Sequence, residues 1–209
     1  MSRRPKGPRR PVKQTVLIVC EGKETERNYF DGLKRTDEVS KFFKIRVVPG
    51  QGGSRLQIVR HAVKKAKQFQ HDECWCVLDT ERLNNEETQK DFADATELAG
   101  EKNIKIVLSN PSFEVWLIAH FERTSKAFNC GDAACAHLDK WFQRSLKRDY
   151  DKSDQDLFNY VRDLVDDACC NAKDVRTHDH GDKTDVADCN SSTSVNKLVE
   201  HLRPESTGK

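Results

Sequence analysis

Apolar residues occur along the first 120 positions in short runs that are separated by amphipathic stretches. The run "TVLIVC" (15–20) is almost continuously apolar, which is typical of a strand buried on both faces. Similar runs follow at 43–49, 74–79 and 104–109. Between them, residues 24–34, the stretch from Arg55 onward and residues 86–100 have helical spacing of apolar positions. This alternation predicts an α/β fold, with a mainly parallel sheet and helices on both of its faces.

The pattern changes after residue 109. In "NPSFEVWLIAHF", Asn110 is expected to cap an apolar helix that has Pro111 at its first position. A helix-rich stretch is expected over 153–173, a loop over 178–192, and a last short helix capped by Thr193 or Ser194. We therefore divide the chain into a tail (1–14), an α/β core (15–122) and a mostly helical C-terminal extension (123–209) that packs on the core.

The first fourteen residues, "MSRRPKGPRRPVKQ", carry six bases and no acid. The whole chain has a formal net charge of +2, so without this tail it is acidic. We expect a disordered arm here, because proline, glycine and like charges dominate the segment. Such an arm either neutralises nucleic-acid phosphates or simply keeps the protein in solution, and the sequence leaves both open.

The rest of the composition indicates a globular protein of the cytoplasm. No apolar run approaches the roughly 20 residues that span a bilayer, and the basic N-terminus lacks the pattern of a secretory signal. Several of the eight cysteines lie within apolar runs, where a thiol behaves as a small apolar side chain. Reduced thiols and a cytoplasmic location, with no membrane association, are therefore expected.

Acidic residues follow three of the four predicted strands. Glu21 comes directly after the first, Asp79 and Glu81 after the third, and Glu114 shortly after the fourth. Because parallel strands end at the same edge of a sheet, these carboxylates should converge there. Clustered carboxylates repel one another unless a cation or a shared proton compensates them, which predicts a Mg²⁺ or Mn²⁺ site. Gly22 would let the main chain approach a phosphate closely, and Glu21 is an alternative general acid or base.

The stretches "VLIVCEGKETERNYF", "VLDTE" and "SNPSFEVWLIAHF" together resemble the RloB-like family. The resemblance covers roughly residues 15–202 and implies a TOPRIM-type catalytic core of the kind found in topoisomerases, primases and overcoming-lysogenization-defect nucleases. It implies that Glu21 is the catalytic glutamate of that core. Asp79 and Glu81 would then fill its metal-binding Asp-x-Asp position, where the second acid is here a glutamate, one methylene longer.

The same resemblance extends to substrate contacts and biological role. Asn110 and Glu114 match the family's Ser-Asn-Pro-x-Phe-Glu signature, and Lys152 lies in a further matching segment, where it would neutralise a phosphate. Members of the family occur beside restriction and phage-defence genes. The resemblance therefore implies a defence nuclease that acts on RNA, including tRNA, together with a partner protein of the defence system.

Two other functions stay open at this point. The chain could be a catalytically silent TOPRIM-like module that binds nucleic acid or a protein through its tail and helical extension. The turn "GQGGS" (50–54), which precedes a helix, is either an ordinary turn or a phosphate-binding loop of a nucleotide binder. In either case Arg55, directly after this turn, is expected to contact the substrate.

Overall fold

The structure of this protein is a computed structural model that describes residues 12–81, 83, 85–179 and 185–204. Most of the expected basic tail lies outside these residues, so the expectation of a disordered arm is not addressed by the fold. The described part of the chain begins at Val12, and the first strand already starts at Gln14.

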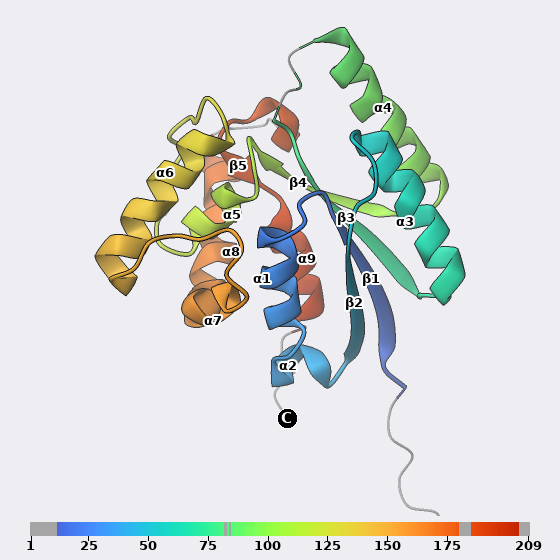
Figure 1. The fold of residues 1–209 in the computed structure, drawn as a ribbon, viewed down its shortest axis with the longest axis horizontal. Coiled ribbons are helices and arrows are strands. Elements are labelled where there is room, and N and C mark those ends of the chain that lie inside the picture. Colours follow the sequence, from blue (N-terminus) through green and yellow to red (C-terminus); the bar gives the residue numbers. More distant parts are fainter. Residues whose placement is uncertain (1–11, 82, 84, 180–184, 205–209) are drawn as a thin grey trace, which may run out of the picture.

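Five strands form one sheet in the order β2-β1-β3-β4-β5 (Figure 1). The strands are β1 (Gln14–Cys20), β2 (Phe43–Pro49), β3 (Glu73–Asp79), β4 (Lys105–Asn110) and β5 (Ser192–Thr193). The first four run parallel, and only β5 pairs antiparallel, on β4. The predicted α/β fold with a mainly parallel sheet is confirmed, and it is consistent with a TOPRIM-like core.

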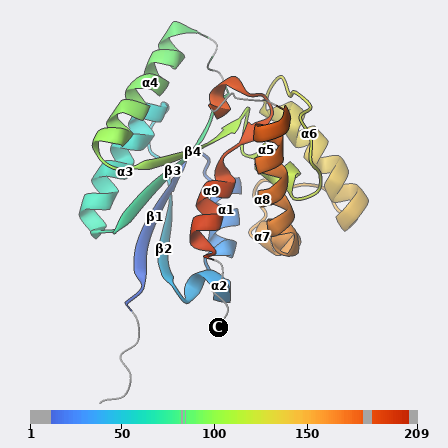
Figure 2. The same ribbon diagram turned by 180° about the vertical axis from the view of Figure 1, so that it is seen from behind.

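Helices cover both faces of this sheet, as predicted (Figures 1 and 2). Helices α3 (Arg55–Phe69) and α4 (Glu86–Glu101) pack on one face, against a cluster that contains Leu17 and Val19. Helices α1 (Thr25–Leu33), α5 (Glu114–Ala119) and α9 (Val195–Leu202) pack on the other, in the cluster that contains Val16 and Ile18. Alternate residues of β1 thus enter opposite cores, which is why this run is apolar throughout.

The remaining elements connect these layers or extend the second one. They are α2 (Asp37–Ser40), α6 (Gly131–Trp141), η1 (Phe142–Leu146), α7 (Leu157–Val161), η2 (Arg162–Leu164), α8 (Val165–Asp174), η3 (Val175–Asp179) and η4 (Val186–Asp188). The helix-rich stretch expected over 153–173 contains α7 and α8, which are joined by the short 3₁₀ turn η2. Among the described residues, no helix combines the length and the apolar character that crossing a membrane would require.

Two local expectations were wrong. Asn110 does not cap a helix: it ends strand β4, its side-chain amide donates to the carbonyls of Val186 and Ala187, and α5 begins only at Glu114. Residues 178–192 are also not all loop, since Ser192 and Thr193 form β5.

Side-chain hydroxyls explain why β5 joins the sheet. The hydroxyls of Thr193 and Ser109 lie 2.9 Å apart, and Ser194 Oγ accepts the Leu108 amide at 2.8 Å. Ser194 does occupy the N-cap position of α9, but its hydroxyl bonds β4 instead of the helix. The C-terminal part of the chain thereby completes the sheet beside β4.

Candidate active site

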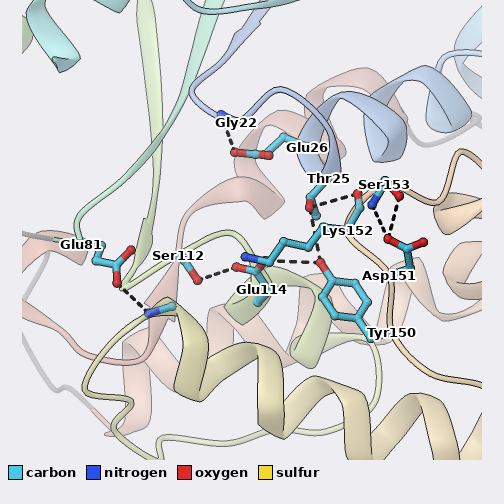
Figure 3. A network of polar contacts seen from close by, with 11 residues as sticks. Gly22, Thr25, Glu26, Glu81, Ser112, Glu114, Tyr150, Asp151, Lys152 and Ser153 are labelled. Atoms are coloured by element: carbon cyan, nitrogen blue, oxygen red, sulfur yellow. Dashed lines mark hydrogen bonds and ion pairs between the residues drawn. The ribbon is translucent and has the colours of Figure 1, made fainter. Parts of the chain in front are cut away.

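The C-terminal edge of the parallel strands opens into a cleft of about 510 Å³ that is lined by acidic side chains. Glu21 follows β1, Asp79 ends β3 with Glu81 two positions later, and Glu114 is the first residue of α5. The structure thus brings all four sequence-derived acids into one cleft. Part of their polar network, with Glu81 and Glu114, is drawn in Figure 3.

Glu21 and Asp79 are joined directly at the centre of this edge. Glu21 Oε2 accepts the main-chain amide of Asp79 at 3.0 Å. Burial raises the pKa of Glu21, while this hydrogen bond and the nearby guanidinium of Arg55 oppose the shift. Burial also raises the pKa of Asp79 well above its usual value, and the surrounding carboxylates, Glu26 first among them, add to the shift. Within the described part of the chain, the buried Oδ1 of Asp79 has no hydrogen-bond partner.

Glu26 is a fifth acid of the cleft, and the sequence analysis missed it. It lies in the first turn of α1, its residue is only 4% exposed, and Oε1 accepts the amide of Gly22 at 2.9 Å. Burial raises the pKa of Glu26 to about 7, and the charges of Glu114 and Glu21 contribute, although hydrogen bonds to main-chain amides oppose them. A signal was present in the sequence: Glu26 shares the inward face of its helix with Tyr29 and Phe30, where an acid is unusual.

The lack of a side chain at Gly22 leaves the space in which the Glu26 carboxylate lies. A Cβ atom at this position would come within 2.1 Å of Glu26 Oε2. We expected Gly22 to leave room for a phosphate. The space beside it is filled by the Glu26 carboxylate, and Gly22 also lines the cleft.

Glu114 lies at the buried end of a small polar network (Figure 3). Its residue is 4% exposed, and its oxygens accept the hydroxyls of Ser112 at 2.6 Å and Tyr150 at 3.3 Å. The ammonium group of Lys152, whose side chain is 51% exposed, lies 3.2 Å from Glu114 Oε1. Partial burial acts to lower the pKa of Lys152, but the Glu114 charge outweighs it and the pKa is raised. Lys152 is thus a stable cation at the rim of an acidic cleft.

Glu81 connects this cleft to the C-terminal part of the chain. Its Oε1 accepts the amide of Gly131, the first residue of α6, at 2.9 Å (Figure 3). A carboxylate at a helix N-terminus is favoured by the helix dipole as well as by the hydrogen bond. Asp132, next in the same helix, also lines the cleft.

Two of the expected substrate contacts are engaged within the fold. Arg55 is buried, and its guanidinium donates to the main-chain oxygens of Asp79 at 2.8 Å and Glu81 at 2.5 Å. Asn110 is held by the carbonyls described above. Of the four expected contacts, Gly22 and Lys152 line the cleft, whereas the described contacts of Arg55 and Asn110 are with the protein's own main chain.

The turn at 50–54 is likewise occupied by the protein itself. Asp91 of α4 accepts the amides of Arg55 at 2.8 Å and Leu56 at 3.4 Å, and the Ser54 hydroxyl accepts that of Gln57. The amides at the start of α3, which a phosphate would need, therefore already have acceptors. This arrangement favours an ordinary capped turn over a nucleotide-binding loop.

The donor set of the cleft suits a hard divalent cation in kind. Carboxylate oxygens are the ligands that Mg²⁺ and Mn²⁺ prefer. The buried Oδ1 of Asp79 accepts no hydrogen bond from the described residues and is therefore available as such a ligand. In the described part of the chain, however, no three His, Cys, Asp or Glu side chains are gathered closely enough to hold a metal ion as they stand. The acids share one cleft but do not surround one point.

The fold and the cleft together define an α/β protein with an acidic site at the carboxyl edge of its sheet. A family model described as RloB-like protein matches residues 16–202 of the chain. The protein therefore belongs to the RloB-like family. Neither a curated protein nor a solved structure gives a match.

Proposed function

We propose that this protein is a metal-dependent nuclease that cleaves phosphodiester bonds in nucleic acid. The observation that carries this proposal is the convergence of carboxylates from the ends of β1 and β3, from α1 and from α5 in one cleft, including a buried Asp79 oxygen that has no hydrogen-bond partner among the described residues. So many acids in one place are costly unless a cation is bound or some of them stay protonated. The TOPRIM-type resemblance supports the same chemistry.

Asp79, Glu81 and Glu21 are the residues that would hold Mg²⁺ or Mn²⁺. A divalent ion at such a site supplies charge to polarise a phosphodiester and to lower the pKa of water. Because no three acids among residues 12–81, 83, 85–179 and 185–204 surround one point, the carboxylates must move together to complete the site.

The protein's own groups would then position the substrate and move protons. Glu26, with a pKa of about 7, can hold or release a proton near neutral pH, and Glu21 is the second candidate for this role. Lys152 lies at the rim, where its ammonium group can neutralise a phosphate when it leaves Glu114. Glu114 anchors Lys152 and Tyr150 and shapes the inner wall of the cleft.

RNA, with tRNA included, is the substrate class that we favour over DNA, and cytoplasmic anti-phage defence with a partner protein is the proposed role. Both proposals rest on the family resemblance, because the acidic cleft would act on the phosphodiester, which RNA and DNA share.

The test is an incubation of the full chain with tRNA, single-stranded DNA and plasmid, in Mg²⁺, in Mn²⁺ or in EDTA. We expect metal-dependent cleavage by wild type and none by Asp79→Asn or Glu21→Gln. The matched control is Glu97→Gln, which removes an exposed acid of α4 away from the cleft and should retain full activity.

Thermal unfolding of the same proteins with and without Mn²⁺ separates an inactive enzyme from a wrong assignment. Stabilisation of wild type and Glu97→Gln but not of Asp79→Asn would place the ion in the cleft even if a trigger for cleavage is missing. Equal cleavage by wild type and Asp79→Asn contradicts the assignment. If no protein cleaves any substrate and Mn²⁺ stabilises none of them, the catalytically silent binding module is favoured.

A further inference from the structure

A second hollow of about 440 Å³ lies beside the acidic cleft, along the outer face of α1. Lys23 and Glu24 line both hollows, so the two meet at the start of this helix. On the facing wall Lys152 lines the cleft, and the next residue, Ser153, lines the second hollow (Figure 3). We call this second hollow the α1 groove. It and the cleft form one continuous path.

Hydrogen bonds hold the two walls of this path in place where they meet. Thr25, in the first turn of α1, donates from Oγ1 to the carbonyl of Lys152 at 3.4 Å. Asp151 Oδ1 accepts both the amide and the hydroxyl of Ser153 at 2.8 Å, which fixes the turn that carries Lys152 (Figure 3). These hydrogen bonds fix Lys152 and Ser153 beside the start of α1.

The α1 groove is lined by more basic than acidic side chains, and two of the basic ones form no ion pair with a described residue. Lys23, Arg27 and Arg35 line it, and all three are exposed. Of the two acids that also line it, Asp31 is paired with Arg27 at 3.4 Å and with Lys34, while Glu24 is exposed at the junction with the cleft. Among the described residues, neither Lys23 nor Arg35 has an ion-pair partner.

We propose that the α1 groove binds the sugar–phosphate backbone of the nucleic-acid strand whose phosphodiester enters the acidic cleft. This inference rests on the proposed nuclease function and adds the route of the substrate. An acidic cleft repels a polyanion, so binding energy has to come from cations beside it. Helix α1 is roughly 14 Å long at the usual rise per residue, so the groove can follow more than one phosphate of a strand.

These cations bind phosphates, which RNA and DNA share. The groove by itself therefore binds a strand whatever its base sequence. Lys23 stands at the junction with the cleft, while Arg27 lies in α1 and Arg35 lies two residues beyond the end of this helix. Arg27 and Arg35 can therefore be removed without changing a residue that lines the cleft.

The experiment measures binding by the full chain in EDTA, so that no cleavage takes place. Fluorescence anisotropy with labelled single-stranded RNA and, separately, single-stranded DNA is recorded over a series of salt concentrations for wild type and for Arg27→Ala/Arg35→Ala. We expect affinity to fall several-fold in the double variant. The slope of log K against log salt should become shallower by about 1.4, or about 0.7 for each lost phosphate contact on a single strand. The strand that binds more tightly identifies the sugar type.

The matched control is Lys64→Ala/Lys67→Ala, which removes two exposed charges from α3 on the opposite face of the sheet. Its affinity should stay close to wild type. Equal losses in both double variants, no loss in the α1 variant, or no strand binding by wild type would each overturn the proposal. Binding of an acidic peptide in place of the strands would assign the groove to a protein partner instead.

Hydrolysis of bis(p-nitrophenyl) phosphate separates this proposal from the nuclease function itself. This diester fits the cleft but is too short to reach Arg27 and Arg35, so the α1 variant should hydrolyse it like wild type while its KM for a long strand rises. Slower hydrolysis of the small diester by the variant would contradict a pure strand-binding role. If no protein hydrolyses it and Mn²⁺ stabilises none of them, the nuclease proposal fails, and the anisotropy still decides the groove.

Discussion

The main-chain amide of Gly22 donates a 2.9 Å hydrogen bond to Oε1 of Glu26, across the junction between β1 and α1. The two residues depend on each other. The carboxylate satisfies an amide at the end of a buried strand, and the glycine leaves the space in which this carboxylate lies. The glycine of the "EG" that follows the first apolar run thus contacts an acid four residues later, in the first turn of α1.

Gly22→Ala should displace the Glu26 carboxylate, because the new methyl group would lie 2.1 Å from Oε2. We expect a loss of about 1–3 kcal/mol in the free energy of unfolding, as for other overpacked sites, together with a strong loss of cleavage. Chemical denaturation and the nuclease assay measure both effects. At the control position, Gly100 in α4, an added Cβ meets no atom within 4 Å, so Gly100→Ala should keep activity and stabilise slightly. Unchanged stability and activity in Gly22→Ala would show that the contact is unimportant.

Glu26 should make the protein less stable as the pH rises through the weakly acidic range. Its pKa is about 7 in the folded chain and near 4.5 when unfolded, so between these values the folded state keeps a proton that the unfolded state has lost. The free energy of unfolding therefore decreases from pH 4.5 to 7, on the order of 3 kcal/mol for this group. Denaturant titrations across this range should give a flatter dependence for Glu26→Gln, and the remaining slope is set by Asp79 and Glu21, which act in the same direction as Glu26, and by His120, which opposes them. Parallel curves for wild type and Glu26→Gln would contradict the shift.

Arg55 should stabilise the end of β3 rather than bind substrate. Its buried guanidinium serves the main-chain oxygens of Asp79 and Glu81, and a lysine cannot reproduce this fork. Arg55→Lys should therefore cost about 1–3 kcal/mol of stability, and cleavage should fall because both acids lose their support. The control is Arg60→Lys, at an exposed position of the same helix, where neither quantity should change. A variant at Arg55 that keeps full stability but binds RNA more weakly would restore the substrate-contact role.

His120 should oppose the effect of Glu26 at acidic pH. The ring is buried, its Nδ1 donates to the Trp116 carbonyl at 3.0 Å, and its Nε2 lies 3.2 Å from the Tyr29 hydroxyl. Burial lowers the pKa of His120 to about 4, although hydrogen bonds to main-chain carbonyls oppose this shift. Unfolding then takes up a proton between pH 6.5 and 4, so stability is lost as the pH falls, on the order of 3 kcal/mol.

The slopes of His120 and Glu26 have opposite signs in overlapping ranges, so each is measured as the difference between wild type and its own variant. His120→Gln should be less stable overall, and its unfolding free energy should depend less steeply on pH below 6.5. A His120→Gln curve parallel to that of wild type would show that the pKa of the ring is the same in the folded and unfolded protein.

The sequence by itself was sufficient for the central sheet and for four acids of the cleft. Long apolar runs form buried strands wherever helices cover both faces, and the four strands predicted from such runs are present to within a residue at each end. Because these strands are parallel, residues that follow them must gather at one edge, which is why Glu21 and Asp79 meet.

Only the tertiary structure decided which polar residues face the cleft and which serve the fold. Ser192 and Thr193 form a strand because Ser109, more than eighty positions earlier, supplies a buried hydroxyl partner. Arg55 and Asn110 donate hydrogen bonds to main-chain carbonyls, whereas the Glu26 side chain is buried near other carboxylates. Apolar periodicity is a local property that a sequence displays directly. The burial of a polar side chain and the choice of its partner depend on segments that approach only when the chain has folded.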